Sequence, residues 1–199
     1  MKVKELKVRL VFTDEVLGMM PSKADIHEQY IASKSPDAAT IEEEVEAIGV
    51  DAVVEDQRTI FPKLPDGTPF MWDYQLRGFF KDAIGMLRRV QGTECSKVKA
   101  YKKLVDGLIM IKERRIPFIF NGKIGDCQRP LRAETAQGPR VALADSETVE
   151  KESALEFTIQ LLDPTLEKLV KECLDYGIYR GIGQWRNAGK GRFEWKEVA

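Results

Sequence analysis

The sequence is poor in the residues that carry metal and redox chemistry. It has one histidine, His27, and three widely spaced cysteines that form no Cys-x-x-Cys pair: Cys95, Cys127 and Cys173. Such a set builds neither a disulfide framework nor a zinc site, and it is typical of reduced thiols. A His-Glu-x-x-His motif and a Walker loop are also absent, which argues against metal-dependent and nucleotide-hydrolysing enzymes. We therefore expect no metal site and no cofactor.

The sequence also lacks a long hydrophobic run. No apolar stretch approaches the length that a membrane-spanning helix needs, and the first residues, Met-Lys-Val-Lys-Glu-Leu-Lys, do not form a signal peptide. The expected location is the cytoplasm, with no membrane partner. The 199 residues, of which 43% are hydrophobic, suit a single domain over residues 1–199 with a real core.

The net charge of −1 conceals a segregation of charge along the chain. Residues 1–70 carry 8 Lys and Arg against 14 Asp and Glu, whereas residues 71–145 carry 15 against 8. A basic middle of this kind favours an acidic partner. That partner is either nucleic acid or the acidic segment of a second copy of the chain, which would build a homo-oligomer.

Periodicity predicts the secondary structure. Alternation of period two predicts strands at 3–12 and 155–162, and apolar runs predict strands at 108–111 and 116–120. Helical spacing predicts helices at 72–87, 96–106 and 166–176, and a last strand follows at 192–198. Residues 59–72 are expected to form a short hairpin around a Pro-Asp-Gly turn.

The predicted order is strand, helix, two strands, helix, strand. This order is typical of an α+β, ferredoxin-like βαββαβ fold, in which both helices cover one face of an antiparallel sheet. Residues 13–72 form an acidic N-terminal insertion in this scheme. Residues 121–140 have no regular period, so we expect a basic loop there, or a hairpin thumb that folds over a bound strand.

The segment 177–193 is the most distinctive part of the sequence. It holds five of the 15 glycines together with Arg180, Arg186, Lys190, Arg192 and Trp185. Glycines allow a ligand to approach the main chain, cations attract phosphate, and an aromatic ring can stack on a base. The alternative is a connecting loop in which Trp185 only anchors the chain to the sheet.

Two further groups of cations fit a phosphate-binding surface. Arg77 and Lys81 lie one helical turn apart on the predicted helix 72–87, and Arg129, Arg132 and Arg140 lie in the basic loop. A charged stripe is also the ordinary solvated face of an amphipathic helix, and loop arginines also serve solubility. Both interpretations stay open at this point.

The glycine-rich loop before the last strand, with Gly181-Ile-Gly183 and Gly189-Lys-Gly-Arg-Phe193, resembles that of the RAMP (repeat-associated mysterious protein) superfamily. Tyr74-Gln-Leu-Arg-Gly-Phe-Phe-Lys81 is similar to the segment that opens the first long helix in the backbone subunits of CRISPR effector complexes. The resemblance implies RNA binding, with a small residue and basic side chains near a guide RNA. It also implies a single-domain relative of phage or prophage origin. The acidic insertion and the basic loop have no clear equivalent in the family.

The leading hypothesis is a non-enzymatic RNA- or nucleotide-binding protein. Its expected binding residues are Arg77, Lys81, Arg129, Arg132, Arg140, Arg180, Gly181, Gly183, Trp185, Arg186, Gly189, Lys190 and Arg192. One alternative is a phage-encoded inhibitor or scaffold that binds a host defence protein or a signalling nucleotide. The other is a metal-independent endoribonuclease with His27 as general acid or base, because imidazole titrates near neutral pH.

Overall fold

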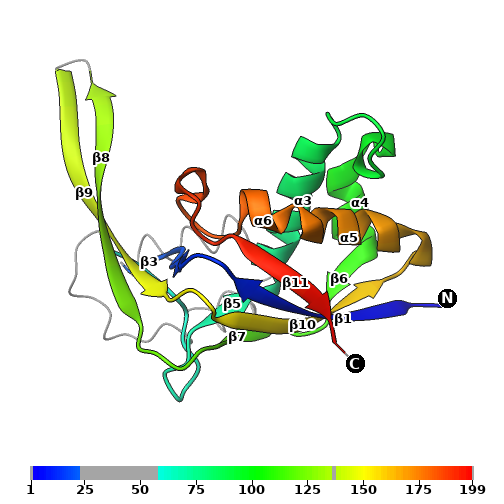
Figure 1. Cartoon of the computed structure of the whole chain (residues 1–199), viewed down its shortest axis with the longest axis horizontal. Coiled ribbons are helices and arrows are strands. Elements are labelled where there is room, and N and C mark those ends of the chain that lie inside the picture. The colour runs from blue at the N-terminus through cyan, green and yellow to red at the C-terminus, as the bar shows by residue number, and fades with distance from the viewer. Residues whose placement is uncertain (1, 23–57, 136–137, 199) are drawn as a thin grey trace.

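The computed structural model describes residues 2–22, 58–135 and 138–198, and for residues 130–143 only the backbone is described. This part of the chain is a mixed α+β structure with two sheets (Figure 1). His27 and most of the expected acidic insertion, residues 23–57, lie outside the described residues.

The main sheet has the strand order β11-β1-β10-β7-β5, and β6 pairs with β10 beside β7. All of its pairings are antiparallel. Its strands are β1 (Lys4–Phe12), β5 (Phe70–Trp72), β6 (Ile109–Ile111), β7 (Arg115–Ile119), β10 (Ala154–Leu161) and β11 (Phe193–Glu197). The strands expected at both ends of the sequence and in its middle are therefore confirmed, within a residue or two.

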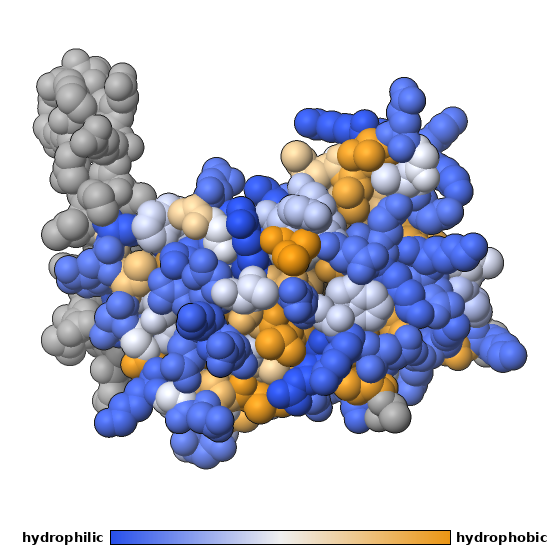
Figure 2. Space-filling model, viewed as in Figure 1, coloured by the Kyte–Doolittle hydropathy of each residue, from blue (hydrophilic) through white to orange (hydrophobic). Residues whose placement is uncertain are grey.

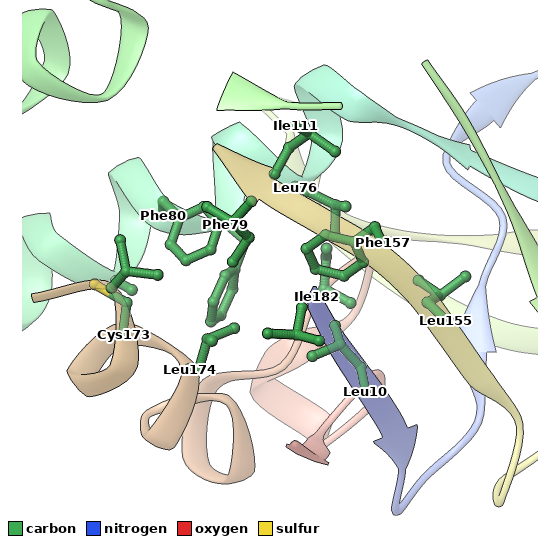
Figure 3. Packing of buried hydrophobic residues seen from close by; sticks show 14 of the residues in the cluster. Leu10, Leu76, Phe79, Phe80, Ile111, Leu155, Phe157, Cys173, Leu174 and Ile182 are labelled. Carbon is green, nitrogen blue, oxygen red and sulfur yellow. The ribbon is translucent and has the colours of Figure 1, made fainter. Parts of the chain in front are cut away.

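Alternation along the two central strands builds one half of the core. In β1 the side chains of Leu6, Val8, Leu10 and Phe12 are at most 1% exposed, whereas Glu5 and Lys7 between them are exposed. The inward side chains of β10, among them Leu155 and Phe157, continue this layer (Figure 3). One face of the sheet is therefore apolar and must be covered.

The helices provide that cover on a single face (Figure 1). They are α3 (Asp73–Leu87), α4 (Tyr101–Leu108), α5 (Glu167–Asp175) and the short α6 (Gly177–Arg180), with 3-10 turns η2 (Cys95–Lys97), η3 (Pro164–Leu166) and η4 (Arg186–Ala188). Figure 3 shows Phe79 and Phe80 of α3 and Leu174 of α5 pointing toward the strand residues. The expected helix at 96–106 is instead the turn η2 followed by α4.

The start of α3 lies within one residue of the expected start at 72. The N-cap is Trp72, and its backbone N–H donates to the side chain of Gln75 at 2.9 Å. Asp73 is the first helical residue, and its carboxylate accepts from Arg77, one turn later, and from Arg114. The carboxylate thus contacts two guanidiniums and also lies where the helix dipole favours negative charge.

The second sheet has the order β2-β9-β4-β3, and β8 pairs with β9 along nearly its whole length. Its strands are β2 (Val16–Leu17), β3 (Met20–Pro21), β4 (Arg58–Ile60), β8 (Gly125–Thr135) and β9 (Gly138–Val149). β8 and β9 form a long antiparallel hairpin that extends away from the helices (Figure 1). The stretch 121–140 thus contains a hairpin arm, not an irregular loop.

The expected hairpin at 59–72 is confirmed only next to its turn, where Lys63 and Pro69 form an antiparallel bridge and the Phe70 amide donates to the Pro62 carbonyl at 3.0 Å. The turn is present, with Gly67 at φ +83° and Asp66 accepting a hydrogen bond from the Thr68 amide. Its two sides then diverge, because β4 pairs with β3 and β9 whereas β5 pairs with β7 in the other sheet.

The visible face of the molecule is mostly hydrophilic, and hydrophobic residues reach it in separate small patches (Figure 2). Within the described ranges, no helix is both long and apolar enough to cross a bilayer.

Candidate nucleic-acid interface

The glycine-rich loop runs from the end of α6 to the start of β11, and its base is closed by its own backbone. The Ile182 amide donates to the Gly191 carbonyl at 2.9 Å, and the Gly191 amide donates to the Glu15 carbonyl at 2.9 Å. A Cβ on Gly181 would lie 2.7 Å from the Lys190 carbonyl oxygen, and one on Gly191 would collide with the Ile182 carbonyl. These two glycines serve internal packing and leave no room there for a ligand.

The tip of the loop, residues 183–189, is more open. Gly183 and Gly189 have φ values of +92° and +89°, but a Cβ on either would meet nothing closer than 3.4 Å. Trp185, with φ +52°, is one of two described non-glycine residues in the left-handed region, and its side chain is 41% exposed. A bulky residue in this conformation costs free energy, so surrounding contacts must hold it.

Two of the loop's arginines converge on one carboxylate. Arg180 Nε and Arg186 Nη1 each donate to Asp82 Oδ2 of α3 at 2.7 Å, and Arg180 Nη2 lies 3.4 Å from Oδ1. Burial of Asp82 raises its pKa, but the hydrogen bonds and charges of the two arginines outweigh burial and bring the pKa below 3.8. The hydrogen bond that Arg180 donates to Asp82 in turn raises the pKa of Arg180.

The other two cations of the loop have different surroundings. Lys190 Nζ lies 2.9 Å from Asp14 and 2.8 Å from Glu15, both in the turn after β1, and the hydrogen bond to Glu15 raises its pKa. Arg192 is exposed, and its side chain makes no hydrogen bond or ion pair with the described residues. Its carbonyl accepts from the Thr13 amide at 2.8 Å, which fixes the end of the loop.

Arg129 of β8 connects the hairpin to the tip of the loop. Its guanidinium lies 5.2 Å from the centroid of the Trp185 ring, and its Nη2 donates to the Gln184 side chain at 2.8 Å. The side chain is only 7% exposed, yet Nε and Nη1 have no hydrogen-bond partner among the described residues. A buried guanidinium keeps donors without such partners only at a cost in free energy.

Two pockets flank the tip. One, of about 360 Å³, lies between the loop and α3 and is lined by Met19, Tyr74, Gln75, Gly78, Phe79, Asp82, Ile182, Gly183 and Arg186. The other, of about 390 Å³, is lined by Arg180, Gly183, Gln184, Trp185, Arg186 and Asn187. They share Gly183 and Arg186, so they adjoin each other and together make up a concave region at the tip. This region combines an aromatic ring, side-chain amides and guanidiniums, which are groups that can bind a base and its phosphate.

The expected cations of α3, Arg77 and Lys81, line neither of these two pockets, and both are paired. Arg77 Nη2 contacts Asp73 at 3.1 Å, and Lys81 Nζ contacts Asp106 of α4 at 2.5 Å. Both side chains are a quarter to a third exposed, so they remain accessible to an anion. Tyr74, on the same helix, lines the first pocket.

The remaining expected residues are not tested here. Arg132 pairs with Val141, and Arg140 with Ala133, in the backbone ladder of the β8–β9 hairpin, but their side chains lie outside the described residues. His27 lies outside as well, so the endoribonuclease hypothesis has no structural test.

The sequence reading missed the acidic residues of the site. Asp82, Asp14 and Glu15 contact cations 98 to 176 positions away in the chain. Spacing patterns in the sequence connect only residues that lie near one another in the chain, so they cannot predict these ion pairs. Gln184 and Asn187 were also missed, although they stand among the loop's glycines and cations, where a polar amide is a usable signal.

No family model and no curated protein sequence matches this chain. Solved structures do resemble it. One is a chain in the "Cryo-EM structure of the Type III-B Cmr-beta bound to cognate target RNA", with a TM-score of 0.54 and 11% identity over 100% of this chain and 60% of that one. Another is a chain of a "Type IV-B CRISPR Complex", with a TM-score of 0.51 and 11% identity over 98% and 91% of the two chains. The fold is therefore one that occurs in CRISPR complexes, and this chain spans 60% of the length of its Cmr-beta counterpart.

Proposed function

We propose that this chain is a non-enzymatic RNA- or nucleotide-binding protein with a RAMP-like fold. The observation that carries the proposal is the concave region at the loop tip, where Arg186, Trp185 and Gln184 face two adjoining pockets. Support at the level of the fold comes from the Cmr-beta chain, whose complex is bound to target RNA. Support within the chain comes from the order β11-β1-β10-β6 with α3 and α5 on one face, which fits a ferredoxin-like unit.

In this proposal the ligand crosses the tip of the loop. Its phosphates contact Arg180, Arg186, Lys190 and Arg192, and a base stacks on Trp185. Arg77 and Lys81 extend the track along α3, and the hairpin side chains Arg129, Arg132 and Arg140 close over it. Multi-subunit assembly, either with a second copy or with other proteins, belongs to the same proposal, because both solved neighbours are chains of complexes.

The test is the double substitution Arg186→Ala with Lys190→Ala, measured as binding of a single-stranded oligoribonucleotide over a range of salt concentrations. We expect weaker binding and a salt slope lower by about 1.4, since each lost phosphate contact on a single strand removes about 0.7. The matched control is Lys102→Ala with Lys103→Ala, which removes two exposed cations of α4. Equal effects of the two double variants would contradict the assigned site.

A phage-encoded inhibitor or scaffold that binds a host defence protein stays a prediction without a structural observation in its favour. Size measured at several protein and salt concentrations is its first test, because contact between acidic and basic segments of two copies weakens as salt rises.

A further inference from the structure

Asp82 of α3 occupies the anion position between Arg180 and Arg186. Its two carboxylate oxygens receive three donor atoms, two from Arg180 and one from Arg186, at 2.7 to 3.4 Å. Arginine binds carboxylate and phosphate with the same planar donor geometry. The donors that hold Asp82 are thus the ones that a phosphate needs, and they cannot serve both fully.

The position of Asp82 leaves it open to competition. Its side chain is 28% exposed, and it lines the pocket between the loop and α3 together with Arg186. On the other side of the Arg186 side chain lies the second pocket, which Arg180 also lines. A ligand in either pocket can therefore reach a guanidinium that Asp82 holds.

The ion pairs of Asp82 with Arg180 and Arg186 are partly exposed, so they contribute less to the stability of the fold than the buried core does. Ion pairs between partly exposed groups contribute little net free energy, because solvent screens the charges. Displacing the carboxylate therefore costs less than breaking a buried pair, provided that the ligand supplies as much negative charge. A ligand with one negative charge would only replace the single charge of Asp82 on the two arginines. Adjacent phosphates supply more negative charge than the carboxylate that they displace.

We propose that Asp82 is a specificity-determining residue: its carboxylate takes the place of a ligand phosphate on Arg180 and Arg186 and must be displaced when the loop binds. The site then rejects singly charged anions and accepts chains of phosphates, such as an RNA backbone or the polyphosphate of a nucleotide. This inference rests on the proposed function, because it assumes that the loop tip binds phosphate.

The test compares Asp82→Asn with Glu94→Gln. Both remove one negative charge that is paired with a cation, but only the first frees Arg180 and Arg186, whereas the partner of Glu94 is Lys97, which is not one of the expected binding residues. With tripolyphosphate as the probe, we expect Asp82→Asn to bind about tenfold more tightly than the wild type, which corresponds to about 1.4 kcal/mol. Glu94→Gln should change affinity by about twofold or less.

Two outcomes overturn the inference: equal gains in both variants, which would reflect net charge alone, or a loss of affinity in Asp82→Asn, which would make Asp82 a residue that positions the arginines. If Asp82→Asn does not fold, the wild-type protein provides the second measurement. The carboxyl ¹³C resonance of Asp82 should move during tripolyphosphate titration as its arginines are withdrawn. Saturable binding with an unmoved resonance overturns the inference.

The same experiment separates this inference from the proposed function. Tighter tripolyphosphate binding by Asp82→Asn, without RNA binding by any variant, refutes the RNA function and supports the role of Asp82. RNA binding by the wild type, without any gain in Asp82→Asn, supports the function and overturns the role of Asp82.

Discussion

The base and the tip of the glycine-rich loop are built on different principles. At the base, Gly181 and Gly191 approach each other's neighbouring backbone so closely that neither has room for a side chain. At the tip, Gly183 and Gly189 have ordinary space around them, and the contacts that hold the chain come from Asp82 of α3 and Arg129 of β8. Packing of its own backbone fixes the base, whereas charged side chains from other elements fix the tip.

This difference shows that a high glycine content does not by itself mark a ligand site. The tight glycines are a requirement of the fold, because they let α6 turn back into β11. The open tip, where Trp185 is strained and the cations depend on exchangeable partners, is the half that can respond to a ligand. Variants that affect the halves differently test this comparison.

The largest effect is expected for Gly191→Ala. Its φ is +70° and the added methyl group would collide with the Ile182 carbonyl, so both backbone strain and overcrowding apply. Together these cost about 3 to 5 kcal/mol of stability. Gly183→Ala is the matched control, since it adds strain at φ +92° without a collision and should cost about 1 to 2 kcal/mol. Urea unfolding of both variants measures the difference, and equal costs would refute the distinction between base and tip.

A smaller effect, of about 2 kcal/mol, is expected for Arg129→Ala. The substitution removes the hydrogen bond to Gln184 and the cation–π contact with Trp185. We expect faster amide hydrogen exchange at residues 183–189 and unchanged exchange at residues 181, 182 and 191. Arg129→Lys should not restore protection, because an ammonium has no planar face to stack on the ring. Uniform loosening of the whole loop would mean that base and tip are one unit.

The smallest effect on stability is expected when the pH is lowered until Asp82 is protonated. The pKa of Asp82 lies below 3.8 in the folded protein, so its contribution is present above that value and is lost as the pH falls through the folded-state pKa. Because the carboxyl is partly exposed, we expect a loss below about 1 kcal/mol. Trp185 fluorescence followed from pH 6 to pH 3 should change in the wild type and change less in Asp82→Asn. Identical curves would show that Asp82 does not hold the tip.

The sequence predicted the elements whose signal is local. Leu6, Val8 and Leu10 alternate with exposed residues in the sequence and do so in β1, and the apolar spacing of α3 and α5 marks their buried faces. The hairpin at 59–72 forms only beside its turn, because turn residues predict a reversal of the chain, whereas the strand partner of each outer end depends on tertiary packing. The β8–β9 hairpin lacks a regular apolar period, so the sequence leaves a hairpin and a loop as alternatives at 121–140, and the strand pairing decides between them.

The candidate site was predicted in the same partial way. The cations and Trp185 stand close together in the sequence, and the structure brings Arg180, Arg186 and Trp185 to one pocket. What the sequence could not give is the state of these cations, because Asp82 and Asp14 reach them from distant parts of the chain. Composition reports which charges are present, whereas only the fold determines which of them are already neutralised.

The central place of β1 has a consequence for synthesis of the chain. Its partners are β10 and β11, which are synthesised much later. Glu156, the partner of Arg9, lies 147 positions further along the chain, and Arg192, the partner of Thr13, lies 179 positions further. A ribosome adds about 5 to 20 residues per second, so β1 stays unpaired for many seconds after it emerges. During that time its apolar face and both its edges are open to other chains. The pairing of β1 is therefore completed only after the last strands have been synthesised. Pairing between segments so far apart in the sequence makes folding slow.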